Sequence, residues 1–316
     1  MRVAFAALAL ALAAASNAMA QNWPAKPIRW VVPFPPGASA DMTARMMSPG
    51  LTEQFGQPVL IDNRAGAASI IAMELVAKSA PDGITILFGN PTVVTSPVLY
   101  KMSFDPMKEL APVIQLTTMQ YVMLASNPFP AKSVAEVLAM ARDRPGTVTC
   151  ASGGGMSEFG CGMFQALGKV NVTQVRYKGN ALAMNDLVSG QVNVMFDLTN
   201  AAFPHVSSGR VRALAITGPA RSTTPFPGLP TVTETIPDYQ LTTWQGVFAR
   251  SGTAVEIIAR INRAIDAVIR REEVRRRLAD LGVEIVGGTP EAFTALVRAD
   301  NIRYSKLIRE LNLSVE

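Results

Sequence analysis

The sequence has few of the residues that metal and redox sites require, with two cysteines and one histidine among 316 residues. A metal site needs several Cys or His ligands close together, and His205 is the only histidine. HExxH, Walker A, CxxC and paired-carboxylate motifs are also missing from the sequence. We therefore expect neither a metal ion nor a cofactor.

Beyond its first residues the sequence has no apolar run that is long enough to span a bilayer. The start is typical of a secretory signal peptide, with an early cation at Arg2, an apolar run over residues 3–15 and small residues up to Ala20. We predict a signal peptide over residues 1–20, cleavage after Ala20, and a mature protein in the periplasm.

The two cysteines, Cys150 and Cys161, form an even pair in a chain that we expect to be exported. Such a pair is a candidate disulfide, because the periplasm is oxidising. The alternative is a pair of small buried apolar residues. A bond would flank the glycine-rich residues 152–157.

Charge is modest, at 17% of the residues, with a formal net charge of +5. Nucleic-acid binding needs a basic patch joined to aromatic or groove-reading elements, which the sequence lacks. We expect a solvated helix face and no nucleic-acid partner. The surplus is concentrated on one helical stretch that contains Arg270, Arg271, Arg275, Arg276 and Arg277.

Short β-rich runs alternate with helical patterns along the chain, which indicates an α/β fold with parallel strands and crossover helices. Removing 20 of 316 residues leaves 296, a length typical of two domains of ~150 residues each. The expected strands cover residues 28–32, 58–61, 85–88, 148–151, 173–177, 192–196, 211–216 and 283–286. The expected helices cover residues 42–54, 70–78, 134–142, 159–167, 182–189, 257–269 and 274–281, with a last helix from Pro290.

The loops that follow strands are the first candidates for a binding site, because ligands bind at the carboxyl ends of strands in open α/β sheets. In the first loop, residues 33–41, prolines stiffen the turn and Gly37 lets the main chain approach a ligand. Ser39 or Asp41 can cap the following helix, whose unpaired N–H groups would form an anion site.

A second glycine-rich loop, residues 152–158, repeats this pattern in the other half of the sequence. Two such loops would clamp a small carboxylate with main-chain dipoles, and neither contains an arginine. The alternative for each is a plain strand-to-helix turn. Asp197, at the end of another strand, is a third candidate, with a helix N-cap as its alternative.

One stretch of the sequence resembles the active site of a hydrolase. Residues 155–159 approach the nucleophile elbow G-x-S-x-G around Ser157, and Asp197 and His205 follow in the order that hydrolases use. Phe159 replaces the closing glycine, and His205 follows Pro204 in a helical stretch where a surface or capping histidine is expected. A periplasmic serine hydrolase using Ser157 and His205 is therefore the alternative function.

Several short motifs occur together along the mature chain: KPIR at residues 26–29, VVPFPPG at 31–37, NRAGA at 63–67, APDG at 80–83, YKG at 177–179, GQV at 190–192, MFD at 195–197, LPTV at 229–232 and GGTP at 287–290. This combination resembles the Bug (TctC) family of tripartite tricarboxylate transporter receptors. The resemblance covers essentially the whole mature chain.

The resemblance implies a periplasmic-binding-protein-like Venus flytrap with two α/β domains joined by two crossing strands. Domain 1 would comprise residues 21–122 and 246–316, and domain 2 residues 123–245, with crossings near residues 119–124 and 242–247. It also implies a solute-binding protein that captures a small carboxylate in the interdomain cleft. A monomer would deliver the ligand to membrane transporter subunits or, alternatively, act as the partner of a two-component sensor.

The ligand contacts that the resemblance implies come from the two loops, from a strand end in each domain, and from a tyrosine in the second. They are Phe34, Pro36, Gly37, Ala38, Ser39, Asp41, Pro91, Thr92, Ser152, Gly153, Gly154, Ser157, Glu158, Tyr177 and Asp197.

The sequence departs from the family pattern at both loops. Ala38 stands where a second glycine is usual, and Leu198-Thr199-Asn200 follow Asp197 in place of Asn-Leu-Pro. Glu158 stands near the place of a histidine. If its carboxylate faces the ligand, it should repel a second carboxylate and favour a donor group. The alternative is a first-turn residue that points into water.

Overall fold

The computed structural model describes residues 23–153, 155–221, 225–280 and 283–310. The predicted signal peptide and Gly154 therefore lie outside the described residues. Packing divides the chain into two compact units. Among the described residues, unit 1 comprises 23–117, 245–276 and 285–305, and unit 2 comprises 118–153, 155–221, 225–244, 277–280, 283–284 and 306–310.

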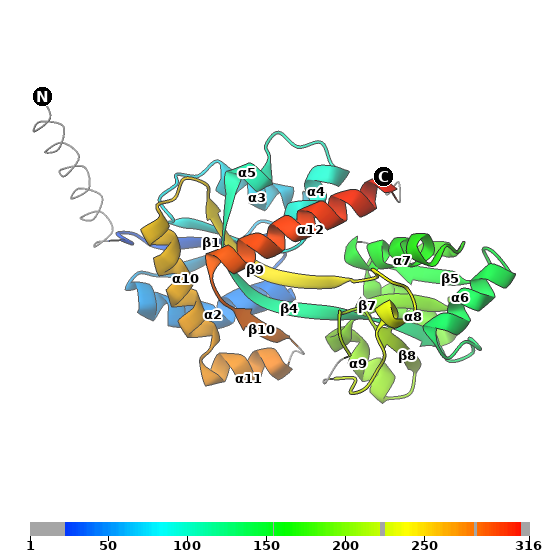
Figure 1. Ribbon diagram of the computed structural model, residues 1–316. Coiled ribbons are helices and arrows are strands. Elements are labelled where there is room, and N and C mark those ends of the chain that lie inside the picture. The colour runs from blue at the N-terminus through cyan, green and yellow to red at the C-terminus, as the bar shows by residue number, and fades with distance from the viewer. Residues whose placement is uncertain (1–22, 154, 222–224, 281–282, 311–316) are drawn as a thin grey trace, which may run out of the picture. The chain divides into compact units, whose positions relative to one another are not determined.

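The sheet of unit 1 has the strand order β2-β1-β3-β9-β4, and β10 pairs with β4 (β4, β9 and β10 are labelled in Figure 1). The first three strands are parallel, and β9 is antiparallel to β3. The strands are β1 (Ile28–Val32), β2 (Val59–Asn63), β3 (Thr85–Gly89), β4 (Leu110–Ser126), β9 (Thr242–Arg250) and β10 (Glu284–Gly287).

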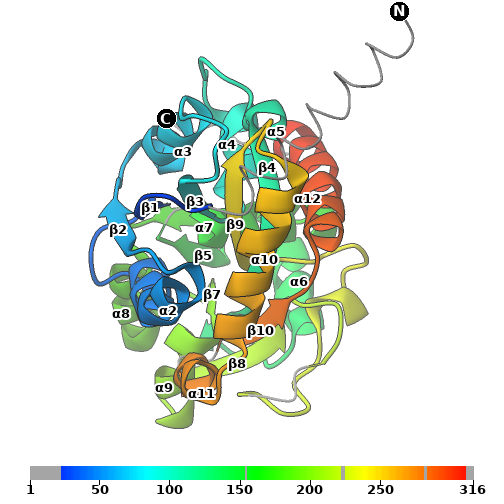
Figure 2. The ribbon, with the colours of Figure 1, turned by 90° about the vertical axis from the view of Figure 1, so that its left-hand side faces the viewer.

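Helices flank this sheet because the apolar strands leave buried faces to be covered. Trp30 and Phe88 meet in the core with ring centroids 5.8 Å apart. Helix α10 packs against α2 (Figure 2), where a side chain at Gly50 would lie 3.0 Å from Val268. The helices are α2 (Ser39–Phe55), α3 (Ile70–Ala77), α4 (Thr92–Leu99), α5 (Pro106–Glu109), α10 (Val255–Ile269), α11 (Glu272–Asp280) and α12 (Pro290–Glu310), with the short turn η1 (Ala67–Ser69).

Unit 2 has the strand order β8-β4-β7-β5-β6. Strands β5, β6 and β7 are parallel, whereas β4 is antiparallel to β7 and β8. The strands are β5 (Thr149–Ser152), β6 (Thr173–Arg176), β7 (Val194–Leu198) and β8 (Val211–Ile216). The helices are α6 (Val134–Asp143), α7 (Gly155–Gly168), α8 (Asn180–Ser189) and α9 (Thr199–Ser207), with the turn η2 (Val232–Glu234).

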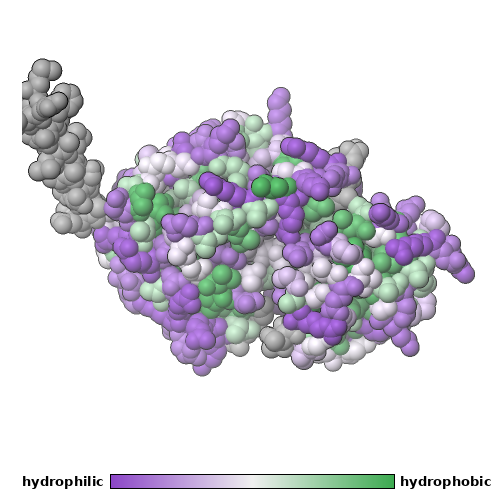
Figure 3. Space-filling model, viewed as in Figure 1, coloured by the Kyte–Doolittle hydropathy of each residue, from purple (hydrophilic) through white to green (hydrophobic). Residues whose placement is uncertain are grey.

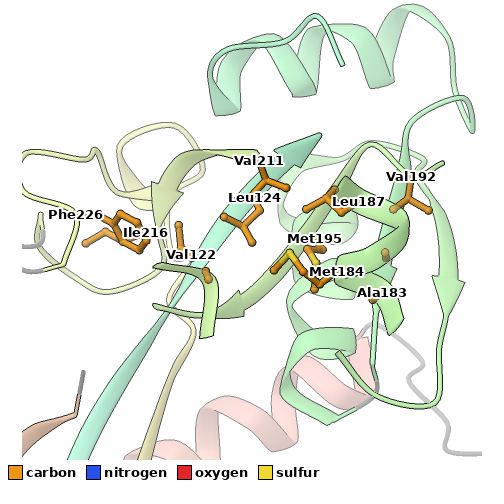
Figure 4. Close-up of a cluster of buried hydrophobic side chains, with 12 residues drawn as sticks. Val122, Leu124, Ala183, Met184, Leu187, Val192, Met195, Val211, Ile216 and Phe226 are labelled. Carbon is orange, nitrogen blue, oxygen red and sulfur yellow. The ribbon is translucent and has the colours of Figure 1, made fainter. Parts of the chain in front are cut away.

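Successive residues of β7 serve opposite faces of this sheet, as the pleat requires. Met195 packs in a cluster with Met184 and Leu187 of α8 (Figure 4). Its neighbour Phe196 instead lies against Phe164 of α7, with ring centroids 6.2 Å apart. Helices therefore cover both faces, which is the arrangement expected of a mostly parallel sheet.

Two strands continue from one unit into the other. The division between the units falls within the two long strands, in β4 after Thr117 and in β9 after Trp244. It also passes through α11, β10 and α12, most of whose residues belong to unit 1. In the part of the chain that the structure describes, no helix has both the length and the apolar character needed to cross a membrane. Apolar residues on the face shown in Figure 3 form small patches between polar ones.

Candidate functional site

The first predicted loop lies at the carboxyl end of β1 and is held by its own helix. Gly37 has a φ of +85°, a left-handed conformation that strains residues with a side chain. Its N–H donates to Asp41 Oδ2 at 2.8 Å, and Ala38 N–H donates to Pro35 O at 3.2 Å. The loop is therefore a defined turn that is closed by a carboxylate.

Asp41 is 2% exposed and joins three parts of unit 1. Arg45 Nε lies 2.9 Å from each of its oxygens, and Asn63 Nδ2 donates to Oδ1 at 2.9 Å. Asn63 Nδ2 also contacts Phe34 O at 3.0 Å, which ties the end of β2 to the loop. Asp41 thus positions the loop.

The charge of Asp41 is stabilised by these donors. Burial alone would raise the pKa of its carboxyl, but the hydrogen bonds from Arg45, Gly37 and Asn63 outweigh burial and hold the pKa below its ordinary value. Because Arg45 neutralises the carboxylate, the loop can approach an anion without an unpaired negative charge beneath it.

The prediction that Ser39 or Asp41 caps α2 is wrong. The helix begins at Ser39, its N-cap is Ala38, and no side chain bonds to the cap. The first intrahelical hydrogen bond runs from Met42 N–H, the fourth residue of the helix, to Ala38 O at 2.9 Å. The main-chain N–H groups of residues 39–41 precede that bond and have no intrahelical acceptor, which is the feature that attracts anions.

Two further loops leave the same edge of the sheet, because β1, β2 and β3 are parallel. After β3, the predicted contacts Pro91 and Thr92 begin α4, and Asn90 Oδ1 accepts from Thr92 N at 3.0 Å. After β2, Ala67, Ala68 and Ser69 have φ values of 45°, 49° and 71°. Consecutive left-handed residues without glycine store backbone strain, a frequent property of functional sites.

The second predicted loop lies between β5 and α7. Gly153 N–H donates to Asn180 Oδ1 at 2.9 Å, and a side chain on Gly153 would lie 2.1 Å from Asn180 N. Asn180 Nδ2 in turn donates to Asp197 Oδ1 at 2.6 Å. Position 153 therefore has no room for a side chain, because the main chain at the start of α8 lies too close.

Asp197 does not cap α9. Its Oδ1 accepts from its neighbour Leu198 N at 2.9 Å, and the N-cap, Leu198, has no side-chain bond. The carboxyl is 5% exposed, and burial raises its pKa against the lowering by Asn180, Leu198 and His205. Among the described residues, no Lys or Arg pairs with Asp197.

Ser157 is buried and bonded to the main chain. Its hydroxyl donates to Phe196 O at 2.7 Å, which fixes the first turn of α7 to β7. His205, in α9, has a buried Nδ1 without a partner among the described residues, and burial lowers its pKa. The serine is therefore held by a carbonyl rather than activated by a histidine, which does not fit the hydrolase arrangement.

Glu158 forms an ion pair with an arginine, a contact that neither prediction about its side chain included. Arg176 Nε lies 2.6 Å from Glu158 Oε1, and the Glu158 side chain is 21% exposed. Arg176 ends β6 beside Ser152 in the register of β5 and β6. The sequence analysis missed Arg176 because it lies in a strand rather than in either loop.

The predicted contact Tyr177 follows Arg176 directly. Its N–H donates to Ser152 O at 2.8 Å, and its hydroxyl donates to Asp186 Oδ2 at 2.7 Å. Burial, followed by this contact with Asp186, raises the pKa of the phenol to about 12. Tyr177 therefore stays neutral and anchors the end of β6 to α8.

A disulfide joins Cys150 of β5 to Cys161 of α7, with Cα atoms 5.9 Å apart. Both residues are fully buried. The bond links the strand before the second loop to the helix after it, so that Ser152 and Gly153 leave from a fixed frame.

Each unit therefore carries a glycine loop at the carboxyl ends of parallel strands, and two strands continue between the units. This architecture defines the class of periplasmic binding proteins. The chain belongs to the tripartite tricarboxylate transporter family of receptors (TctC), which it matches over residues 43–313.

Individual relatives agree with this family. The chain is 32% identical to BugT of Bordetella pertussis over 302 residues, which covers 94% of this chain and 92% of BugT. An R. palustris protein solved with adipate has a TM-score of 0.77 at 31% identity, covering 92% of this chain and 99% of that one. MatC from Rhodopseudomonas palustris with bound malate has a TM-score of 0.75 at 32% identity, covering 90% and 100%.

These comparisons confirm the predicted α/β fold of the periplasmic-binding-protein type and the family resemblance. The family and its solved members are substrate-binding proteins, so the chain is a solute-binding receptor and not an enzyme. The hydrolase alternative is wrong. The assignment of individual ligand contacts stays a prediction.

Proposed function

We propose that this receptor binds a small carboxylate in the periplasm and delivers it to a tripartite tricarboxylate transporter. The observation that carries the proposal is the start of α2, where three main-chain N–H groups follow a loop closed by Asp41. The adipate and malate bound to two solved relatives support the same ligand class.

The start of α2 suits a carboxylate for two physical reasons. The N–H groups of residues 39–41 have no intrahelical acceptors, and the helix dipole adds a partial positive charge at this end. Asp41 does not oppose binding, because Arg45, Asn63 and Gly37 satisfy its oxygens. The site therefore holds an anion without presenting an arginine to it.

A screen for bound carboxylates tests the ligand class. We expect at least one aliphatic or aromatic carboxylate to raise the thermal midpoint of the mature protein by several degrees. At 100 times its dissociation constant a ligand adds about 2.7 kcal/mol. A flat response to the whole series, with a response to amines or sugars instead, would contradict the proposal.

The alternative to delivery to a transporter is that the ligand-bound receptor binds to a two-component sensor and activates it. Deleting the gene should abolish uptake of the labelled ligand if the receptor serves a transporter. Loss of ligand-dependent gene induction with normal uptake would favour the sensor. The N-terminal sequence of the protein from periplasm, which we expect to begin at Gln21, tests the signal peptide.

A further inference from the structure

The ion pair between Glu158 and Arg176 lies among the predicted contacts of the second loop. Ser152 and Arg176 are register partners at the ends of the parallel strands β5 and β6, and Glu158 is in the first turn of α7. The carboxyl ends of β5, β6 and β7 share one edge of the sheet, where ligands of open α/β folds bind.

We propose that Arg176 is a specificity-determining residue, which neutralises Glu158 and offers its remaining guanidinium nitrogens to a carboxylate on the ligand. The inference rests on the proposed function, since it requires a carboxylate ligand at the second loop. It reverses the expectation drawn from Glu158 alone, because a paired Glu158 no longer repels an anion.

The geometry leaves Arg176 able to make such a contact. Arg176 Nε lies 2.6 Å from Glu158 Oε1, and this is the one ion pair of Arg176 among the described residues. The Arg176 side chain is 59% exposed, and that of Glu158 is 21% exposed. A guanidinium has five N–H donors, so an arginine that is paired with one carboxylate and is largely exposed keeps donors for a second carboxylate.

Stability gives little reason for this pair. Ion pairs with an exposed partner stabilise proteins weakly, and β6 is the last strand of the sheet, so Arg176 has no strand beyond it to pack against. Variants of the pair should therefore fold, and their effects should appear in ligand preference.

The test measures preference rather than affinity alone. Calorimetry gives the dissociation constants for straight-chain dicarboxylates from succinate to suberate and for their monoamides. The ratio for the best dicarboxylate and its monoamide is compared in wild type, Arg176→Gln, Glu158→Gln and the double variant. The matched control is the exposed pair of Arg144 and Asp143, 3.5 Å apart, which lies outside the second loop: Arg144→Gln and Asp143→Asn change the net charge equally.

Arg176→Gln should shift the ratio about tenfold or more towards the monoamide, because it removes a donor and leaves Glu158 uncompensated. Glu158→Gln should shift it in the opposite direction, and the double variant should lie between them. The control variants should change it less than twofold.

The proposal is overturned if the wild type binds dicarboxylates and the ratio stays within about twofold in both single variants. It is also overturned if the control pair shifts the ratio equally, since net charge would then be the cause. Failure of the wild type to bind any carboxylate would instead refute the proposed function, and the inference with it.

Discussion

The two loops are built alike but carry opposite electrostatics. In each, an Asn–Asp pair holds a glycine N–H: Asp41 accepts from Gly37 with Asn63 beside it, and Asn180 accepts from Gly153 with Asp197 behind it. Asp41 has Arg45 as a partner, and its pKa is lowered. Asp197 pairs with no Lys or Arg in the described part of the chain, and burial raises its pKa.

Similar loop geometry is therefore reached in one unit with a paired carboxylate and in the other without a cation beside it in the part of the chain that the structure describes. In unit 1 the carboxylate contacts the glycine directly and needs its charge to hold Arg45. In unit 2 the amide of Asn180 contacts the glycine, and the Asp197 carboxylate accepts hydrogen bonds from neutral donors. Ionised Asp197 therefore loses its hydration on burial, and no ion pair among the described residues offsets this loss. Glycine and aspartate variants of the two loops should distinguish these two arrangements.

The largest effect should come from Gly153→Ala. A Cβ at this position would lie 2.1 Å from Asn180 N, so the second loop must move and carboxylate binding should be lost. A Cβ at Gly37 would meet no atom of the described residues within 4 Å. Gly37→Ala therefore only incurs the cost of a left-handed residue with a side chain, about 1 kcal/mol, and binding should weaken moderately.

Calorimetry on both variants, with circular dichroism to confirm folding, compares the two glycines. Equal losses of affinity would show that the close approach at Gly153 does not control the site.

The next largest effect should come from the disulfide, which flanks the second loop and has no counterpart at the first. Replacing Cys150 and Cys161 together by alanine should lower the free energy of unfolding by about 3 kcal/mol, since the bond closes an 11-residue separation. Denaturant melts measure this loss. Intact mass of periplasmic protein with and without reductant should differ by two hydrogens, and two free thiols before reduction would contradict the bond.

Asp41→Asn and Asp197→Asn should differ in their effect on stability. The first leaves Arg45 without its carboxylate and should cost about 1–3 kcal/mol. The second removes a poorly solvated charge, and the new amide oxygen can still accept from Asn180 and Leu198, so the change should be near zero or favourable. A larger loss in Asp197→Asn would invert the comparison.

The smallest effect is the pH dependence of that difference. The pKa of Asp41 is lowered from 3.8, so its contribution is present above pH 3.8 and is lost as the pH falls towards the folded pKa. The pKa of Asp197 is raised from 3.8, so its contribution is full below pH 3.8 and is lost as the pH rises through the folded pKa.

Unfolding free energies of wild type and the two asparagine variants at several pH values from acid to neutral measure this dependence. The deficit of Asp41→Asn should shrink at acid pH, and any advantage of Asp197→Asn should shrink as well. Parallel curves for the three proteins would contradict both pKa shifts.

The sequence was sufficient for the fold and for the position of both loops, because these depend on local patterns. The predicted strand over residues 28–32 is β1 itself, and the glycine loops follow strands as expected. The capping prediction for Ser39 and Asp41 was wrong, since it assumed a later helix start. Local sequence says which residues can cap, but the first turn decides which one does.

The residues that hold the loops were beyond local patterns. Asn63, Asn180 and Arg176 each reach a partner brought close by strand pairing or by helix packing. Each stands outside the two loops, so nothing in the sequence near those loops indicated its role. Strand pairing places Arg176 beside Ser152, whereas the contacts of Asn63 and Asn180 depend also on where α2 and α8 begin.

A crystal structure of the mature protein with its best carboxylate would show whether the start of α2 holds a ligand carboxylate. We predict a carboxylate oxygen within about 3.2 Å of the main-chain nitrogens of residues 39–41. A ligand whose carboxylates lie away from these nitrogens, held by side chains elsewhere in either unit, would contradict the account.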